Sequence, residues 1–176
     1  MEWKEELQQH TKEAEKIVQG YLPEETGHQK LLIEASNYSV LVGGKRLRPM
    51  IMLESFKAFG GTGNVVEPFM AALEMIHSGS LVHDDLPCMD NDEYRRGNLT
   101  TWKKYGYDMA VLAGDKLFIY AFETAAKAFA LTDRADLVGK AISILANKAG
   151  IYGMIGGQSV DVEYTDRPVT KSQLEF

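Results

Sequence analysis

Residues able to bind a cation and a phosphate are concentrated between His77 and Gly97. Five carboxylates fall within ten positions and two adjacent arginines follow them; these residues are Asp84, Asp85, Asp90, Asp92, Glu93, Arg95 and Arg96. Carboxylates this close together repel one another unless a cation neutralises them. Their oxygens suit a hard ion, Mg²⁺ or Ca²⁺, and guanidinium groups form paired hydrogen bonds with phosphate. The segment therefore indicates a divalent cation and a phosphate-bearing ligand.

Two other interpretations of the acidic segment agree less well with the sequence. An EF-hand loop needs glycine at its sixth position, but counting from Asp90 places Arg95 there. A solvated loop is the commoner outcome for an acidic run, yet here an aspartate pair ends a very apolar stretch and Arg-Arg-Gly follows. Mg²⁺ fits best, because proteins usually bind it through a few carboxylates together with substrate phosphates.

His77 is expected to point in the same direction as the acidic cluster. His77, Leu81 and Asp84 are spaced as i, i+4 and i+7, which places them on one face of a helix. Taken alone, His77 is more simply interpreted as a hydrogen-bonded histidine of the core.

A second candidate anion site is the turn Gly43-Gly44-Lys45-Arg46-Leu47-Arg48-Pro49. Its glycines free the backbone, and its basic side chains precede a predicted helix start, where an anion is favoured. It is not a Walker A loop, because the first glycine and the Lys-Ser/Thr pair of that motif are not in place. A glycine helix end followed by a basic surface turn remains the alternative.

Composition excludes several classes of protein. The 176 residues, 45% hydrophobic and 25% charged, predict one globular domain over 1–176. A net charge of −6 argues against nucleic acid as the main partner. The single cysteine, Cys88, excludes an internal disulfide and a multi-cysteine zinc site. No apolar run is long enough to span a membrane, and the acidic start is unlike a signal peptide, so a cytoplasmic location is expected.

Three-to-four-residue hydrophobic spacing predicts an all-α chain. The expected helices span 2–20, 28–42, Pro49 to about Phe59, 65–83, 107–131 and 134–155, with a loop over 86–100. Helix 65–83 is the most apolar and is expected to be central. Gly156-Gly157 should fall near the end of the last of these helices.

The C-terminus resembles the beginning of a further helix. Thr170 and Gln173 have the spacing of a capping box. Leu174, Glu175 and Phe176 would then begin a helix that has no room to form. We therefore expect the natural protein to continue beyond this sequence.

Four motifs together resemble the trans-isoprenyl diphosphate synthases, which include farnesyl and geranylgeranyl diphosphate synthases. The motifs are Gly43-Gly44-Lys45-Arg46-Leu47-Arg48-Pro49, Asp84-Asp85-x-x-x-x-Asp90, Arg95-Arg96-Gly97 and Gly156-Gly157-Gln158-x-x-Asp161. They occur in the family's order and at similar spacing, and Ala113-Gly114-Asp115 also matches. The resemblance covers roughly 28–165 and implies a helix bundle of the isoprenoid synthase type, truncated to its N-terminal portion.

The resemblance assigns residues to two diphosphate sites. The site for the allylic diphosphate comprises Asp84, Asp85, Asp90 and Arg95. The site for isopentenyl diphosphate comprises Gly44, Lys45, Arg48, His77 and Arg96. Asp84 and Asp90 are the implied Mg²⁺ ligands, which Asp85 supports as a further ligand or through a hydrogen bond. Gln158 and Asp161 are implied to line the cavity near the reacting carbons.

The implied reaction is a head-to-tail condensation of isopentenyl diphosphate with dimethylallyl or geranyl diphosphate, giving farnesyl or geranylgeranyl diphosphate. Mg²⁺ neutralises the leaving diphosphate, so the allylic C–O bond can ionise. The isopentenyl double bond attacks the resulting cation, and a proton is lost. The cation needs a dry pocket, which an apolar helix bundle provides. Members of the family are usually homodimers, so a second copy of the chain is the expected protein partner.

The chain departs from the family pattern after Gln158. The sequence contains neither a second aspartate-rich motif nor a Lys-Thr-Gly segment, so the chain alone is predicted to have little or no synthase activity. One alternative is therefore a non-catalytic subunit or fragment that binds diphosphate or forms a dimer. A terpene cyclase is a further alternative, but it does not need the isopentenyl site implied for Lys45, Arg48 and His77.

Product length depends on a weaker inference. In the family, residues just before the first aspartate form the floor of the product tunnel, and here they are the small residues Gly79 and Ser80. A deep tunnel would allow a C20 product as well as a C15 product. Close packing between helices is the alternative explanation for Gly79.

Overall fold

A computed structural model describes residues 3–174 of the chain. Contacts divide it into two compact units, Met1–Asp133 and Arg134–Phe176. The expectation of one domain over 1–176 remains a prediction.

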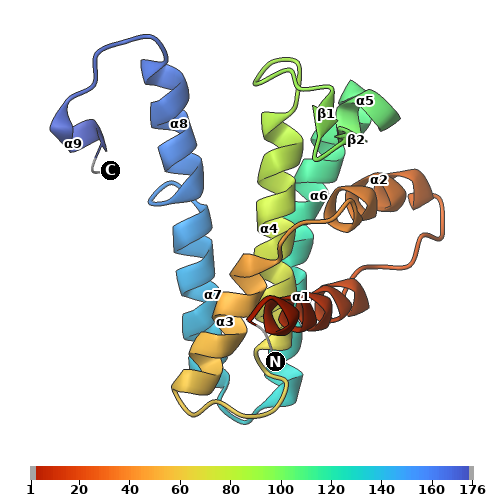
Figure 1. The fold of residues 1–176 in the computed structure, drawn as a ribbon, viewed down its shortest axis with the longest axis vertical. Coiled ribbons are helices and arrows are strands. Elements are labelled where there is room, and N and C mark those ends of the chain that lie inside the picture. The colour runs from red at the N-terminus through yellow and green to blue at the C-terminus, as the bar shows by residue number, and fades with distance from the viewer. Residues whose placement is uncertain (1–2, 175–176) are drawn as a thin grey trace. The chain divides into compact units, whose positions relative to one another are not determined.

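The first unit is helical apart from one short ribbon (Figure 1). Its elements in chain order are α1 Trp3–Gly20, α2 Lys30–Leu41, α3 Leu47–Ala58, α4 Glu67–Asp84, β1 Tyr94–Arg95, β2 Asn98–Leu99, α5 Thr101–Tyr105, α6 Tyr107–Ala126 and the 3₁₀ helix η1 Lys127–Leu131. The predicted helices over 2–20, 28–42 and 65–83 are confirmed within the described residues, with ends shifted by a few positions.

Helix α4 is the centre of this unit, as its apolar sequence predicts. Met70 and Met75 are fully buried, and α6 runs beside α4 (Figure 1). The facing side of α6 consists of small and aliphatic residues, among them Ala113, Leu117 and Ala121, all without exposed surface. Burying these side chains removes apolar area from water and holds α4 straight between its two ends.

Helices α1 and α3 cover one end of α4. Ala14, Met50, Val66 and Met70 form a buried cluster there, with Phe56 and neighbouring side chains packed against it. Within α1, Ala14 and Val18 are buried, whereas Trp3 at its start is exposed. Helix α1 therefore contacts the unit through its C-terminal half.

The predicted third helix is also confirmed with shifted ends, since it begins at Leu47 and not at Pro49, with Arg46 as its N-cap. The predicted loop over 86–100 is wrong in part. The segment 86–100 contains the ribbon β1–β2, in which Tyr94 pairs with Leu99 and Arg95 with Asn98. The two connecting residues, Arg96 and Gly97, both have positive φ, as in the tight hairpin turns that match strand twist.

The second unit contains α7 Ala135–Ala149, α8 Met154–Tyr164 and α9 Lys171–Leu174. The prediction of one helix over 134–155 is wrong, because the helix is interrupted between Gly150 and Gly153. At Gly153 an added Cβ would lie 2.0 Å from the Lys148 carbonyl oxygen, so the break requires glycine. Gly156-Gly157 consequently lies in the first turn of α8 instead of at a helix end.

The predicted capping box before α9 forms in part. The Gln173 side chain accepts hydrogen bonds from the Thr170 N–H at 2.7 Å and from the Thr170 hydroxyl at 2.8 Å. A helix begins there as predicted, while Glu175 and Phe176 lie outside the described residues.

The all-α class predicted from the sequence is confirmed, with the two-residue strands of the ribbon as the exception among residues 3–174. In the same range, no helix combines the length and the apolar character needed to cross a membrane.

Candidate functional site

The acidic site is built where α4 ends. Asp84 is the last residue of α4 and Asp85 is its C-cap. The Asp90 N–H then donates a hydrogen bond of 2.8 Å to the Asp84 carbonyl. This bond folds residues 86–89 into a compact loop and returns Asp90 to the end of the helix, as the spacing of the motif requires.

Asp84 and Asp90 are the carboxylates available to a cation. Neither side chain forms a hydrogen bond or ion pair with another described residue. Burial and then the negative charge of Asp90 raise the pKa of Asp84, so a cation between them would relieve a real electrostatic cost. The described part of the chain holds no ready-made group of three or more acidic, histidine or cysteine ligands. Two carboxylates fit Mg²⁺, whose remaining ligands are commonly water and substrate phosphate.

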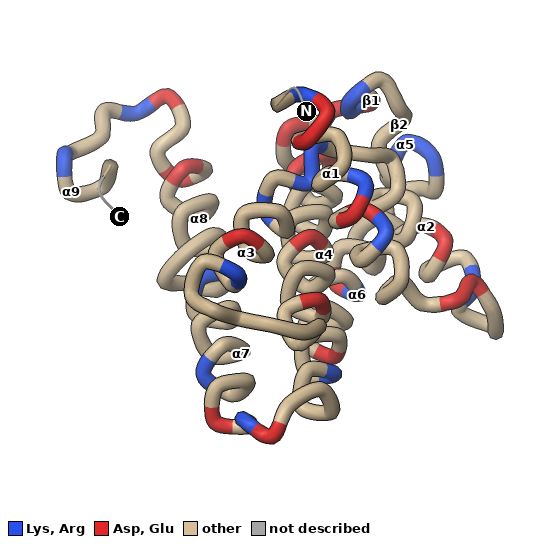
Figure 2. Tube along the Cα trace, turned by 60° about the horizontal axis from the view of Figure 1, so that its bottom comes forward, with Lys and Arg blue, Asp and Glu red and all other residues tan. Residues whose placement is uncertain are grey.

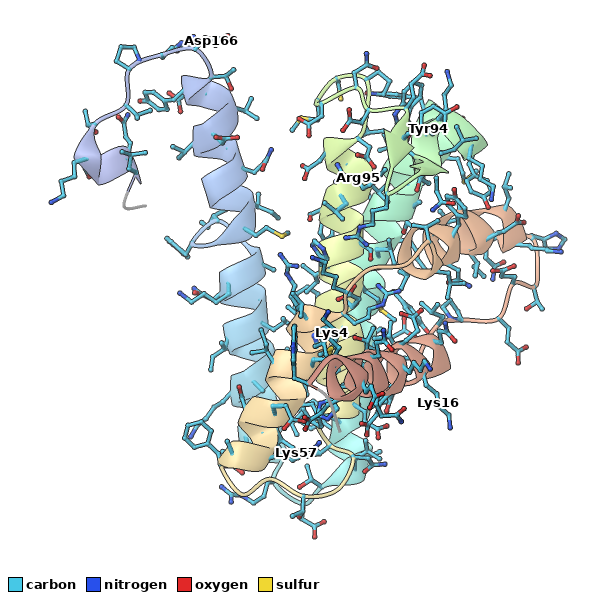
Figure 3. All side chains as sticks on the ribbon, viewed as in Figure 1. Lys4, Lys16, Lys57, Tyr94, Arg95 and Asp166 are labelled. Carbon is cyan, nitrogen blue, oxygen red and sulfur yellow. The ribbon has the colours of Figure 1, made fainter. Side chains whose placement is uncertain are left out.

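Asp85 has a different environment from its neighbour. It is 4% exposed, and Arg95 donates to its Oδ1 from Nε at 2.7 Å and approaches it with Nη2 at 2.6 Å. Burial raises the pKa of Asp85 although Arg95 opposes the shift. Asp85 therefore holds the guanidinium of Arg95, which reaches from the ribbon toward α4 (Figure 3). The role expected for Asp85 in supporting Asp84 and Asp90 at a metal ion remains a prediction.

Contacts from α2 and α5 hold the ribbon that carries Arg95 and Arg96. The Tyr38 hydroxyl donates to the Leu99 carbonyl at 2.8 Å. The Trp102 indole and the Thr100 hydroxyl both donate to the Asp92 carbonyl at 2.8 Å. These hydrogen bonds to backbone carbonyls fix the ribbon that carries the two arginines, and none of them is evident from the charge pattern.

Arg96 brings the ribbon to the basic turn that precedes α3. Its guanidinium donates a hydrogen bond to the Gly43 carbonyl. At Gly44 an added Cβ would lie 2.6 Å from Arg96 Nη1. A residue larger than glycine at Gly44 would therefore displace the Arg96 side chain.

The basic turn also meets His77 from α4. Arg48 Nη1 lies 3.4 Å from His77 Nε2. Burial and then the charge of Arg48 lower the pKa of His77, so the imidazole is neutral near pH 7. The structure brings together Gly44, Arg48, His77 and Arg96. Lys45 is exposed on the same turn.

Arg46 differs from the other bases of the turn. It is 3% exposed and forms ion pairs with Glu15 and Glu74. Its charge is therefore not available to an anion, contrary to the interpretation that all the bases of the turn add to one positive site. Around α1, acidic and basic positions lie next to one another (Figure 2). Glu74, three residues before His77 in an apolar run, was a signal for this contact that sequence reasoning missed.

His83 lies in the last turn of α4, next to Asp84. Its Nε2 lies 3.0 Å from the Val111 carbonyl oxygen and 3.7 Å from Asp115 Oδ1, and its ring packs edge-on against Phe118. It thus fixes the last turn of α4 against α6. Gly79 faces the same helix: an added Cβ would lie 3.2 Å from Leu117 Cβ and 3.3 Å from the Gly114 carbonyl oxygen. This favours helix packing as the reason for Gly79, and its effect on product length remains a prediction.

Gln158 and Asp161 both lie on α8 in the second unit. Gln158 is half-buried and Asp161 is exposed. Their predicted role at the reacting carbons remains a prediction.

The comparisons with known proteins agree with this geometry. A family model described as polyprenyl synthetase matches residues 29–175. The chain belongs to the polyprenyl synthetase family, and the resemblance seen in its motifs is confirmed.

Several curated relatives share extensive identity with the chain. The geranylgeranyl pyrophosphate synthase of Catharanthus roseus is 49% identical over 129 residues, which are 73% of this chain and 36% of the relative. The farnesyl diphosphate synthase of Micrococcus luteus is 42% identical over 147 residues, which are 84% of this chain and 50% of the relative. The chain thus spans half or less of the length of these two proteins.

Solved structures match the fold. A FPP/GFPP synthase from Zymomonas mobilis has a TM-score of 0.88 at 33% identity, covering 97% of this chain and 62% of that one. A geranyltransferase from Legionella pneumophila has a TM-score of 0.89 at 32% identity, covering 97% and 60%. The predicted isoprenoid synthase type of helix fold is confirmed.

The contact between Arg48 and His77 predicts an unusual imidazole titration. We expect an NMR titration to give His77 a pKa below the usual value of about 6.5, and Arg48→Gln to raise it, because a repelling charge is removed. In the parent, the unfolded chain binds protons at His77 more readily than the folded chain, so this residue lowers stability as pH falls below about 6.5. The same pKa in parent and Arg48→Gln would show that the two side chains do not interact.

Proposed function

We propose that the chain is the part of a short-chain prenyl diphosphate synthase that binds both diphosphate substrates through the two ends of one helix face. The observation that carries the proposal is the pair Asp84 and Asp90 at the end of α4, neither of which has an ion-pair partner among residues 3–174, with the basic cluster around Arg48 and His77 two turns earlier. Seven residues separate Asp84 from His77, about 10 Å along a helix. This spacing is long enough to keep two diphosphates apart. The one at Asp84 would be neutralised by Mg²⁺, and the one at Arg48 and His77 by basic side chains.

The acidic end is suited to the allylic diphosphate. Asp84 and Asp90 would hold Mg²⁺, which supplies neutralisation of the leaving diphosphate when bound. Arg95, fixed by Asp85, keeps its Nη1 group without a partner among residues 3–174 and can donate it to the same diphosphate. Breaking the allylic C–O bond leaves its electron pair on that diphosphate and a cation on carbon.

The basic end is suited to isopentenyl diphosphate. Arg48, Arg96 and Lys45 supply donors, and neutral His77 keeps a ring nitrogen for hydrogen bonding beside Arg48. Oriented there, the isopentenyl double bond forms the new C–C bond to the allylic cation, and a proton is then lost. Holding both reactants in place accounts for a large part of such rate enhancements.

The names of the relatives support the reaction class. Both farnesyl and geranylgeranyl synthases are among them, so a C15 and a C20 product are both consistent with the proposal. A homodimer, implied by the resemblance, and a cytoplasmic location, expected from the composition, remain expectations. Terpene cyclase chemistry is disfavoured, because it gives no role to the cluster around Arg48 and His77.

Mg²⁺ is predicted to stabilise the chain through Asp84 and Asp90. With inorganic pyrophosphate present, Mg²⁺ should raise the melting temperature, because a hundredfold excess over the dissociation constant adds about 2.7 kcal/mol to the free energy of unfolding. Asp84→Asn should abolish this rise. Without metal the variant should melt at the same or a higher temperature, because ionised Asp84, whose pKa is raised, destabilises the fold. The exposed Asp133→Asn is the matched control. An Mg²⁺ effect that persists in Asp84→Asn would place the cation elsewhere.

Substrate binding and turnover test the proposed function itself. Isopentenyl diphosphate should bind in EDTA, and Arg48→Gln should weaken it about tenfold or more, as expected for a charged hydrogen bond. Incubation of the chain with Mg²⁺, isopentenyl diphosphate and geranyl diphosphate should give little prenyl product, because the second aspartate-rich motif is absent from the sequence. Failure to bind isopentenyl diphosphate would contradict the proposal, and Mg²⁺-dependent elongation would contradict only the expected inactivity.

A further inference from the structure

Arg46 is a buried cation in the middle of an otherwise exposed basic turn. Its Nη1 donates to Glu74 Oε1 at 2.6 Å, and its Nη2 donates to Glu15 Oε1 at 3.1 Å. Nε also donates to Glu15, and Nη2 to the Val40 carbonyl. One side chain therefore connects α1, α4 and the end of α2. We name Glu15, Arg46 and Glu74 the carboxylate bridge.

The backbone of Arg46 needs such support. Its φ is +50° in the left-handed region, which non-glycine residues occupy only where surrounding contacts hold them. This conformation turns the chain from the Gly43–Gly44 segment into α3. Lys45, just before Arg46, is exposed, and Arg48, two residues after it, reaches His77.

The charges of the bridge agree with a fixed geometry. Burial alone would raise the pKa of Glu15, but hydrogen bonds and the charge of Arg46 bring it below its usual value. Glu15 therefore stays ionised opposite the Arg46 guanidinium, which also contacts Glu74. Glu74 lies one helical turn before His77 on α4, so the bridge also ties the turn to the helix face that presents His77.

We propose that the carboxylate bridge positions Lys45 and Arg48 for a diphosphate, which makes Glu15 a positioning residue supplied by α1. Helix α1 lies outside the residues matched by the family model, which begin at 29. The inference rests on the proposed function only for the identity of the ligand. The bridge itself acts on the geometry of the turn, whichever diphosphate occupies it.

The sign of the charge effect makes the proposal sharply testable. Glu15→Gln removes a negative charge near an anion site, so electrostatics alone would strengthen anion binding. Loss of positioning would weaken it. We expect Glu15→Gln to bind inorganic pyrophosphate about three- to tenfold more weakly in EDTA, within the usual range of coupling between neighbouring residues. Calorimetry should be run at a temperature where circular dichroism shows both proteins folded.

A double-mutant cycle separates positioning from a general loss of structure. In an Arg48→Gln background, Glu15→Gln should weaken binding by clearly less than it does in the parent, because one of the two side chains that it positions is gone. Arg46→Lys keeps the charge but cannot contact both carboxylates and the Val40 carbonyl together, so it should behave like Glu15→Gln. Glu54→Gln, which breaks an exposed ion pair with Lys57 on α3, is the matched control and should leave affinity unchanged.

The outcomes distinguish this inference from the proposed function. Equal or tighter pyrophosphate binding by Glu15→Gln, or the same loss in both backgrounds, would overturn the positioning role and leave the proposed function intact. If the parent binds isopentenyl diphosphate no better than pyrophosphate, the proposed substrate is wrong. Weaker pyrophosphate binding by Glu15→Gln that is coupled to Arg48→Gln would still support the bridge. A parent that binds neither ligand would overturn both.

Discussion

The burial of α4 is the constraint on which the first unit depends. Small residues on α6 allow the two helices to pack closely, and an apolar helix held this way cannot rotate without exposing its core side chains. Residues at fixed intervals along α4 then acquire fixed positions in space. Glu74, His77, Asp84 and Asp85 are such residues, and each one organises a different contact.

The charged groups around α4 are sorted by their partners. Asp85 and Glu74 face inward and are neutralised by Arg95 and Arg46, respectively. Among residues 3–174, Asp84 lacks such a partner, and Arg48 meets only the neutral His77. Paired charges fix geometry because separating either partner leaves a buried charge uncompensated. In the proposed function, the unpaired charges are left for ligands, a cation at the acidic end and a diphosphate at the basic turn.

Much of this arrangement could be predicted from the residues themselves. Apolar spacing located α4, and the motif of Asp84 and Asp90 indicated the candidate cation site. The different environments of Asp84 and Asp85 could not be predicted, because adjacent aspartates look alike until the ribbon places Arg95. Arg46 was misinterpreted for the same reason: its partners lie far from it in the chain. The break between α7 and α8 depends on a close approach at Gly153, which hydrophobic periodicity does not register.

Paramagnetic relaxation by Mn²⁺ in place of Mg²⁺ would test most directly whether α4 separates a metal-dependent end from a metal-free end. With inorganic pyrophosphate present, amide NMR signals of residues 84–90 should broaden most. The signals of residues 44–48 should broaden less. These residues lie beside His77, which is about 10 Å from Asp84 along the helix, and the broadening by Mn²⁺ falls steeply with distance. Equal or stronger broadening at residues 44–48 would contradict the account, since it would place the metal at the basic turn.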